Sequence, residues 1–183
     1  AKVGGPAVNP YQPTGVWAEA TFGNKQYDQG HGEDLYRRSL YTFWRRIVGP
    51  TIFFDAAKRQ TCSVKDSRTN TPLHALTTLN DVTYVEAARA LAQRVLKSSD
   101  KDDTCIETAF RIASSRKPTS AEISILLARL DQLRSHYAAA PEQAQQLLSV
   151  GESPRDERLD ASEHAAYTAL CSLLLNLDEA LTK

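Results

Sequence analysis

The feature that most constrains the fold is a pattern repeated over residues 70–183, in which a helix start signal precedes apolar residues at helical spacing. Asn70 or Thr71 can cap a helix whose first position is Pro72, where the missing proline N–H leaves no hydrogen bond unmade. Asp81 can cap the next helix, whose apolar residues would share one face. These apolar residues are Val82, Val85, Ala88, Leu91, Ala92, Val95 and Leu96.

The same kind of signal continues to the end of the chain. Thr119 and Glu122 match a capping box, in which each side chain accepts a hydrogen bond from the other residue's backbone. A core-facing apolar stripe follows it, made of Ile123, Leu126, Leu127, Leu130 and Leu133. Further helix starts are predicted at Asp103, Pro141 and Asp160, with Gly151 ending the helix that begins at Pro141 and a loop over 151–160.

The first 70 residues have a different character. Residues 1–35 are interrupted by glycine and proline too often for a long helix or strand, so we predict an extended arm. The arm would be anchored through Val8, Tyr11, Val16, Trp17 and Phe22. Residues 36–48 are rich in aromatic and β-branched types and predict a short strand, and residues 61–65 allow a second.

Together these patterns predict a mainly α fold. We expect a single domain over residues 1–183, made of an extended arm (1–35), short strands and loops (36–69) and a helical body of five or six helices (70–183). Because the chain begins with Ala1 and contains no methionine, we expect it to be a processed chain or a fragment of a larger protein. Its apolar runs, such as Leu173–Leu175, do not exceed four residues, far fewer than the roughly 18 residues of a membrane span.

Charge is balanced over the whole chain but not along it. The 22 basic and 22 acidic residues cancel, whereas a general nucleic-acid binder carries a surplus of positive charge, so we expect no nucleic-acid partner. Residues 35–70 hold eight basic and two acidic residues, for a local charge of +6.

This basic stretch is the candidate ligand site. Arginine binds carboxylate, sulfate or phosphate with paired hydrogen bonds, and aromatic faces pack on sugar rings. The candidate ligand-binding residues are Arg37, Arg38, Tyr41, Trp44, Arg45 and Arg68. The alternative is that the aromatic residues are core and the arginines pair with Glu33, Asp34, Asp55 and Asp66.

The sequence predicts no catalytic or metal-binding residues. His31, His74, His136 and His164 are scattered, without the spacing of a metal site. No nucleophile elbow or phosphate loop is present. Cys62, Cys105 and Cys171 are odd in number and widely spaced, so their disulfide status stays open.

Four stretches of the chain are similar, in order, to one family. They are HGEDLYRRSLYTFWRR (31–46), RTNTPLHALTTLNDVTYVEAARALAQRVL (68–96), FRIASSRKPTSAEISIL (110–126) and LCSLLLNLDEALTK (170–183). They resemble the planctomycete-type domain of unknown function 1553, and residues 4–17 resemble the segment leading into this part of it. His74 stands where the family usually has glutamine and Val82 where it usually has proline, which puts in doubt only a role for the side chain at 74.

The resemblance implies a cellular context more than a mechanism. Such domains are typically the C-terminal part of large exported proteins that often carry a cytochrome-c-like module upstream. We therefore expect a periplasmic or cell-surface location and, as partners, the upstream domains of the same polypeptide. Any haem c would lie in such an upstream module, and we expect no cofactor in this chain.

Three functions are carried forward as hypotheses. The first is a non-catalytic structural or interaction module of a larger exported, redox-linked protein. The second is an acidic-glycan or anion-binding module built on the basic stretch, with acidic polysaccharide as its ligand. The third is a part of a polysaccharide-processing enzyme.

Overall fold

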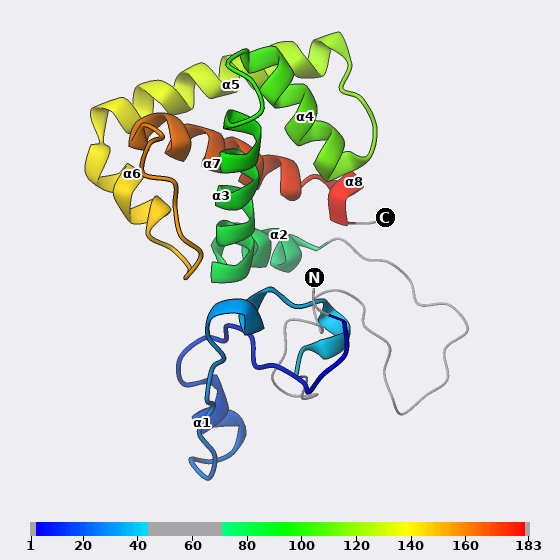
Figure 1. The fold of residues 1–183 in the computed structure, drawn as a ribbon, viewed down its shortest axis with the longest axis vertical. Coiled ribbons are helices and arrows are strands. Elements are labelled where there is room, and N and C mark those ends of the chain that lie inside the picture. The colour runs from blue at the N-terminus through cyan, green and yellow to red at the C-terminus, as the bar shows by residue number, and fades with distance from the viewer. Residues whose placement is uncertain (1–2, 44–70, 182–183) are drawn as a thin grey trace. The chain divides into compact units, whose positions relative to one another are not determined.

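The computed structural model describes residues 3–43 and 71–181. The chain divides into two compact units, residues 1–69 and residues 70–183, and each is described by itself (Figure 1). We call them the N-terminal unit and the helical body. That the two form a single domain stays a prediction.

The N-terminal unit contains short helical turns among non-repetitive backbone. They are α1 (Val16–Ala20) and the 3-10 helices η1 (Gly32–Tyr36) and η2 (Ser39–Tyr41). Trp17 of α1 is buried and stacks on Tyr27 with ring centroids 5.3 Å apart, which is a contact within residues 1–35 themselves. Phe22, also predicted as an anchor, is 93% exposed.

The strand predicted over residues 36–48 is wrong in the part that the structure describes. Residues 36–43 form the end of η1 and then η2, and Thr42 makes an isolated bridge to Val8. The backbone of Val8 donates to the carbonyl of Tyr41 at 2.8 Å and accepts from Phe43 at 2.7 Å. Within residues 3–43 the aromatic residues have no sheet neighbours, and strand preference depends on such neighbours. Residues 44–48 and the second predicted strand, 61–65, lie outside the described residues.

The helical body has seven α-helices within residues 71–181. They are α2 (Pro72–Asn80), α3 (Val82–Leu96), α4 (Asp102–Ser114), α5 (Ser120–Ala139), α6 (Pro141–Leu148), α7 (Ala161–Leu175) and α8 (Asp178–Leu181). The predicted mainly α fold is thereby confirmed. The four-residue α8 is the helix that the start signals did not indicate.

Most of the predicted start signals cap the helices as expected. The side chain of Asp81 accepts from the backbone of Thr83 at 2.9 Å, and that of Asp160 accepts from the backbone of Glu163 at 2.9 Å. Thr119 and Glu122 form the capping box. The predicted cap at Asp103 is wrong, because α4 begins at Asp102 with Lys101 as its N-cap.

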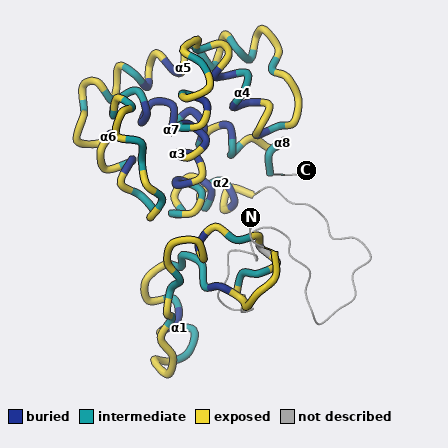
Figure 2. The backbone as a smooth tube through the Cα atoms, in the orientation of Figure 1, coloured by how far each residue is buried: buried dark blue, intermediate teal, exposed yellow. Residues whose placement is uncertain are grey.

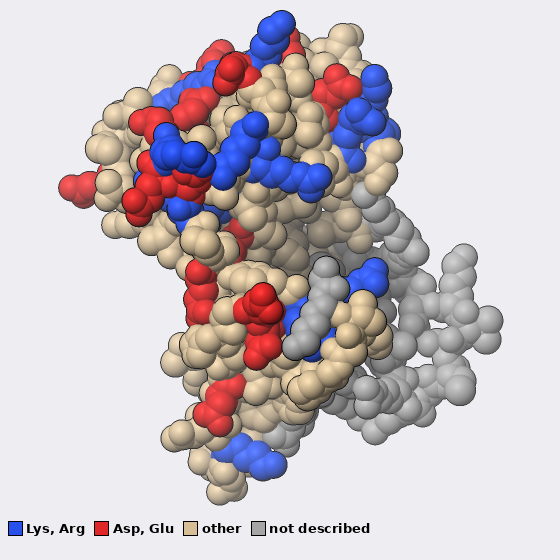
Figure 3. Space-filling view, viewed as in Figure 1, with Lys and Arg blue, Asp and Glu red and all other residues tan. Residues whose placement is uncertain are grey.

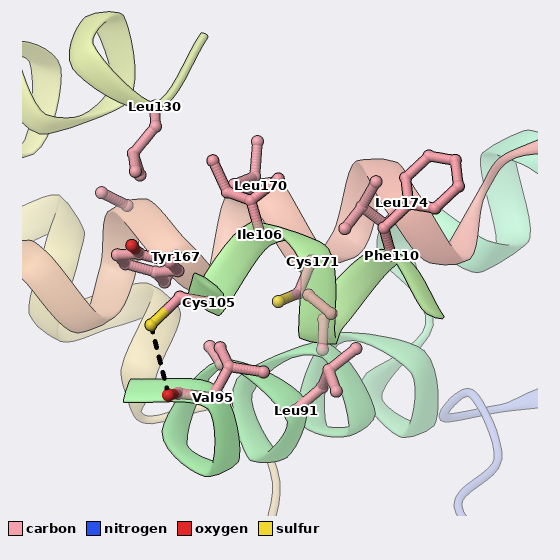
Figure 4. Close-up of a cluster of buried hydrophobic side chains, with 14 of the residues drawn as sticks. Leu91, Val95, Cys105, Ile106, Phe110, Leu130, Tyr167, Leu170, Cys171 and Leu174 are labelled. Atoms are coloured by element: carbon pink, nitrogen blue, oxygen red, sulfur yellow. Dashed lines mark hydrogen bonds between the residues drawn. The ribbon is translucent and has the colours of Figure 1, made fainter. Parts of the chain in front are cut away.

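The core of the helical body is centred on α7, which contacts each of the other six helices from α2 to α8. Figure 2 shows buried positions gathered along α3 and α7. Figure 4 shows Ile106 of α4 beside Leu170 of α7 and Phe110 of α4 beside Leu174 of α7, while Leu91 and Val95 of α3 belong to the same cluster. Each such side chain stabilises the fold by about 1.5–3 kcal/mol when fully buried.

Two cysteines belong to this core. Cys105 and Cys171 are buried free thiols, and the Cys105 thiol donates to the carbonyl of Val95 at 3.3 Å (Figure 4). Burial raises the pKa of both thiols, so they behave as small apolar residues and not as nucleophiles. Cys62 lies outside the described residues.

A buried ion pair fastens the loop that connects α6 with α7. Glu86 and Arg89 of α3 are buried and 3.3 Å apart. Arg89 donates to the carbonyl of Leu148 at 3.1 Å and to that of Ser153 at 2.8 Å, and Glu86 accepts from the backbone of Ser153. The pair therefore binds the backbone of the loop to α3.

Gly151 is the position in this loop that only glycine suits. Its φ of +84° is unfavourable for other residues, and an added Cβ would lie 2.8 Å from Cγ of Glu86 and closer still to the carboxyl group. Because that carboxyl group is held by Arg89 and Ser153, it cannot move away without losing buried hydrogen bonds.

His164 of α7 lies in the same region and is fully buried against α3. Its Nε2 is 3.2 Å from the carbonyl of Arg89, which can only accept, so the Nε2 atom carries the proton. Within the described residues its Nδ1 has no hydrogen-bond partner. Burial lowers the pKa of His164, and the charges of Arg155 and Arg89 lower it further.

We predict that Gly151→Ala lowers the free energy of unfolding by at least about 2 kcal/mol, because it combines backbone strain with a clash against Glu86. Urea unfolding followed by circular dichroism measures this. Gly151→Asn is the matched variant, since asparagine tolerates positive φ but keeps the Cβ. If Gly151→Asn were as stable as the unaltered chain, the clash with Glu86 would be ruled out.

We predict that the free energy of unfolding decreases as the pH is lowered from about 7.5 to about 5.5. With the pKa of His164 held below its usual 6.5, the unfolded chain binds a proton here that the folded chain does not, so falling pH favours unfolding. His164→Gln should flatten this dependence, while His136→Gln, at an exposed position, should not. Equal slopes for all three proteins would contradict the assignment.

Candidate functional site

The predicted basic stretch contributes one paired set of side chains in the described N-terminal unit. The guanidinium of Arg37 lies 4.1 Å from the ring centroid of Tyr41. Arg37 donates to the carbonyl oxygens of Gly4 and Pro6, and the backbone N–H of Gly4 donates to the Tyr41 hydroxyl at 2.8 Å. The pair therefore holds the unit's own chain over residues 4–6.

Of the other predicted site residues, only Arg38 lies within the described residues. Arg38 is exposed. Trp44, Arg45 and Arg68 lie outside the described residues, as do Asp55 and Asp66, the proposed carboxylate partners. Of the predicted site residues, the structure therefore brings together Arg37 and Tyr41. The backbone carbonyls of Gly4 and Pro6 accept hydrogen bonds from Arg37.

A cluster that the sequence did not indicate joins three helices of the helical body. Arg134 of α5 donates to both carboxylate oxygens of Asp102 of α4, each at 2.7 Å, and to Glu163 of α7 at 2.8 Å. The hydroxyl of Tyr167 donates to Asp102 at 2.7 Å. Only tertiary structure could reveal this cluster, because its members are scattered along the chain.

This cluster borders a cavity of about 250 Å³ that Cys105 also lines. Hydrogen bonds from Arg134 hold the pKa of Asp102 below its usual value, and burial raises the pKa of Tyr167. Asp102 is therefore an ionised acceptor and Tyr167 a neutral donor at neutral pH. Since Arg134 is paired with both carboxylates, the cluster fastens α4, α5 and α7 together.

The described residues contain neither a metal-binding cluster nor a helix that could span a membrane. Within residues 3–43 and 71–181, no three His, Cys, Asp or Glu side chains are grouped so that they could hold a metal ion. No helix in the described parts of the chain has both the length and the apolar character needed to cross a membrane.

On the face of the helical body in Figure 3, basic and acidic side chains lie intermixed, so no field of one sign dominates there.

The most distinctive surface of the helical body is apolar and centred on α2. This helix buries His74 and Thr78 and exposes its leucines, which is the reverse of an ordinary amphipathic helix. Thr78 donates to Asn176, just beyond α7, at 2.7 Å, which brings the end of α7 beside α2. We define the leucine surface as Leu73 (59% exposed), Leu76 (60%), Leu79 (40%), Leu173 (39%) and Leu177 (37%).

A groove of about 210 Å³ adjoins the leucine surface, because Leu79 and Leu173 line both. Buried apolar residues line it, namely Val85, Ala88 and Leu133. Its polar lining consists of Arg129, Tyr137, Thr168 and Ser172. It contains no carboxylate, so Arg129 is the one charged residue among the lining side chains described.

The spacing of Leu73, Leu76 and Leu79 was visible in the sequence, but it ordinarily indicates a core-facing stripe. Two polar residues of the same helix indicate the opposite orientation, in which the leucines face outward. His74 and Thr78 are one helical turn apart and make local hydrogen bonds, since the His74 ring accepts from the backbone of Thr71 at 2.9 Å and Thr78 donates to the carbonyl of His74 at 3.0 Å. These bonds let the polar face be buried.

The chain matches a known protein family. A sequence model described as "PSD1: Protein of unknown function (DUF1553)" matches residues 1–130. No curated protein and no solved structure matches the chain.

Proposed function

The chain belongs to the PSD1 family of proteins of unknown function (DUF1553), and from that premise we propose that it is a protein-interaction module whose docking site is the leucine surface. The observation that carries this proposal is the outward apolar face of α2. Contiguous exposed apolar patches are typical of protein interaction sites.

Free energies indicate what a partner must do at this surface. Burying a fully exposed leucine contributes about 1.5–3 kcal/mol, whereas association costs at least about 4 kcal/mol in lost freedom of motion. The five leucines are each only partly exposed, so a stable complex must cover most of them together and use the adjoining groove. This favours a partner of complementary shape over loose adhesion.

The proposed partner is another domain of the same exported polypeptide. A periplasmic or cell-surface location and a redox-linked neighbour that carries haem c are parts of this proposal. In that arrangement the module would hold neighbouring domains together, and the chemistry would belong to those domains. An exposed apolar docking surface suits this role.

We predict that Leu73→Gln combined with Leu76→Gln weakens binding to the separately expressed neighbouring domains at least about tenfold, the equivalent of about 1.4 kcal/mol. Since both side chains are exposed, the free energy of unfolding should change by less than about 0.5 kcal/mol. Isothermal titration calorimetry measures binding, and Ile125→Gln, at a 68% exposed position on α5, is the control. Absence of binding by the unaltered chain, or equal binding by the leucine variant, would count against the proposal.

The second candidate function, an acidic-glycan or anion-binding module, has one favourable observation. Arg38 is exposed beside Arg37 and Tyr41, which form a preassembled cation–aromatic pair. The backbone carbonyls that engage Arg37 reduce the donors it can offer an anion. The first candidate is therefore preferred.

For this second candidate we predict that sulfated and uronic polysaccharides bind while neutral ones do not, and that binding weakens as salt rises. Arg38→Ala combined with Arg68→Ala should abolish such binding, whereas Arg94→Ala, at an exposed position on α3, should leave it intact. The measurement is a titration against a polysaccharide panel at several salt concentrations. Binding that survives the double substitution would eliminate this candidate.

A further inference from the structure

The residues that line the groove indicate what chemistry a partner should have. This inference rests on the proposed interaction function. We propose that the leucine surface binds an amphipathic helix, which inserts one large apolar side chain into the groove and places a carboxylate against Arg129. This recognition mode lays the apolar face of one helix along a preformed hydrophobic site.

The size and lining of the groove suit a single anchor side chain. Its volume of about 210 Å³ exceeds that of an engineered apolar cavity of roughly 150 Å³ that accepts a benzene ring. Val85 and Leu133 supply buried apolar contacts, and Leu79 and Leu173 stand at its junction with the leucine surface. A leucine, methionine or phenylalanine side chain would therefore exchange water for apolar contacts on entering it.

The polar side of the groove has unused hydrogen-bonding capacity. Within the described chain, Arg129 is exposed and donates from Nη1 to Gln132 at 3.0 Å, which leaves most of its five N–H groups for a ligand. Tyr137 follows Arg129 by two helical turns on α5, so both side chains lie on one face of that helix. An arginine with free donors and no carboxylate among the groove's lining residues favours an acidic group on the partner.

The shape of the leucine surface favours a helix as the partner element. Leu73, Leu76 and Leu79 follow one face of α2 and extend over about 9 Å at the helical rise of 1.5 Å per residue. Two turns of a partner helix cover that length, with anchors at helical spacing. The α2 of a second copy would supply leucines but no carboxylate, since Pro72–Asn80 contains no acidic residue, so pairing of α2 with α2 would leave Arg129 without a partner.

The experiment is a selection from a displayed library of amphipathic helical peptides against the purified full chain. The library has a leucine-bearing face and randomised residues at its flanks. We expect enriched peptides to carry a large apolar anchor with aspartate or glutamate beside it. Against the Arg129→Glu chain, lysine or arginine should replace the acid, and selected peptides should change their preference at least about tenfold in Kd.

Matched variants separate the possible outcomes. Arg94→Glu makes the same charge change at an exposed position on α3 and should leave the acidic preference unchanged, and Arg129→Gln should remove it without reversing it. If peptides bind the leucine surface but show no acidic preference, or keep it with Arg129→Glu, the carboxylate inference is overturned while the interaction function stands. If no peptide is enriched, or if Leu73→Gln with Leu76→Gln leaves peptide binding unchanged, the helix inference is overturned. The interaction function fails only if the neighbouring domains also do not bind the leucine surface in the calorimetric titration.

Discussion

The burial of α7 is the constraint on which the rest of the helical body depends. This helix contacts all six other helices of the body, and its buried side chains, such as Leu170 and Leu174, contribute to one continuous apolar core. Because α7 is buried on most of its surface, the other helices must arrange themselves around it. The apolar residues of α3 and α4 meet that requirement directly, since their stripes face the core.

Paired polar groups then determine how the less apolar segments are held. The Glu86–Arg89 pair binds the loop after α6 to α3, and Arg134 joins α4, α5 and α7 through two carboxylates. The Glu86–Arg89 pair is buried, and it would be costly without every partner. The Arg134 cluster is only half-buried, and its paired hydrogen bonds fix the relative positions of three helices. The groove has walls from α2, α3, α5, α6 and α7, and its shape depends on that arrangement.

The orientation of α2 follows from the burial of its polar face. Burial of His74 and Thr78 is offset by hydrogen bonds to Thr71 and Asn176, and it leaves Leu73 and Leu76 facing outward. Because these leucines are largely exposed, they contribute little to the core, and this orientation is the basis of the proposed docking surface. The adjoining groove and Arg129 are the basis of the chemistry proposed for its partner.

Local features of the fold were predictable from the sequence, and features that depend on distant residues were not. Asp81, Thr119 and Asp160 cap helices through backbone groups two or three residues away, so spacing alone revealed them, and the mainly α fold followed. The bond that positions α2 joins Thr78 with Asn176 across 98 residues, and Arg37 finds its acceptors at Gly4 and Pro6, over 30 residues away. Helix capping is a short-range interaction, whereas the face that a helix buries is decided by the free energy of all its neighbours, so the leucine surface and its groove emerged only from the tertiary structure.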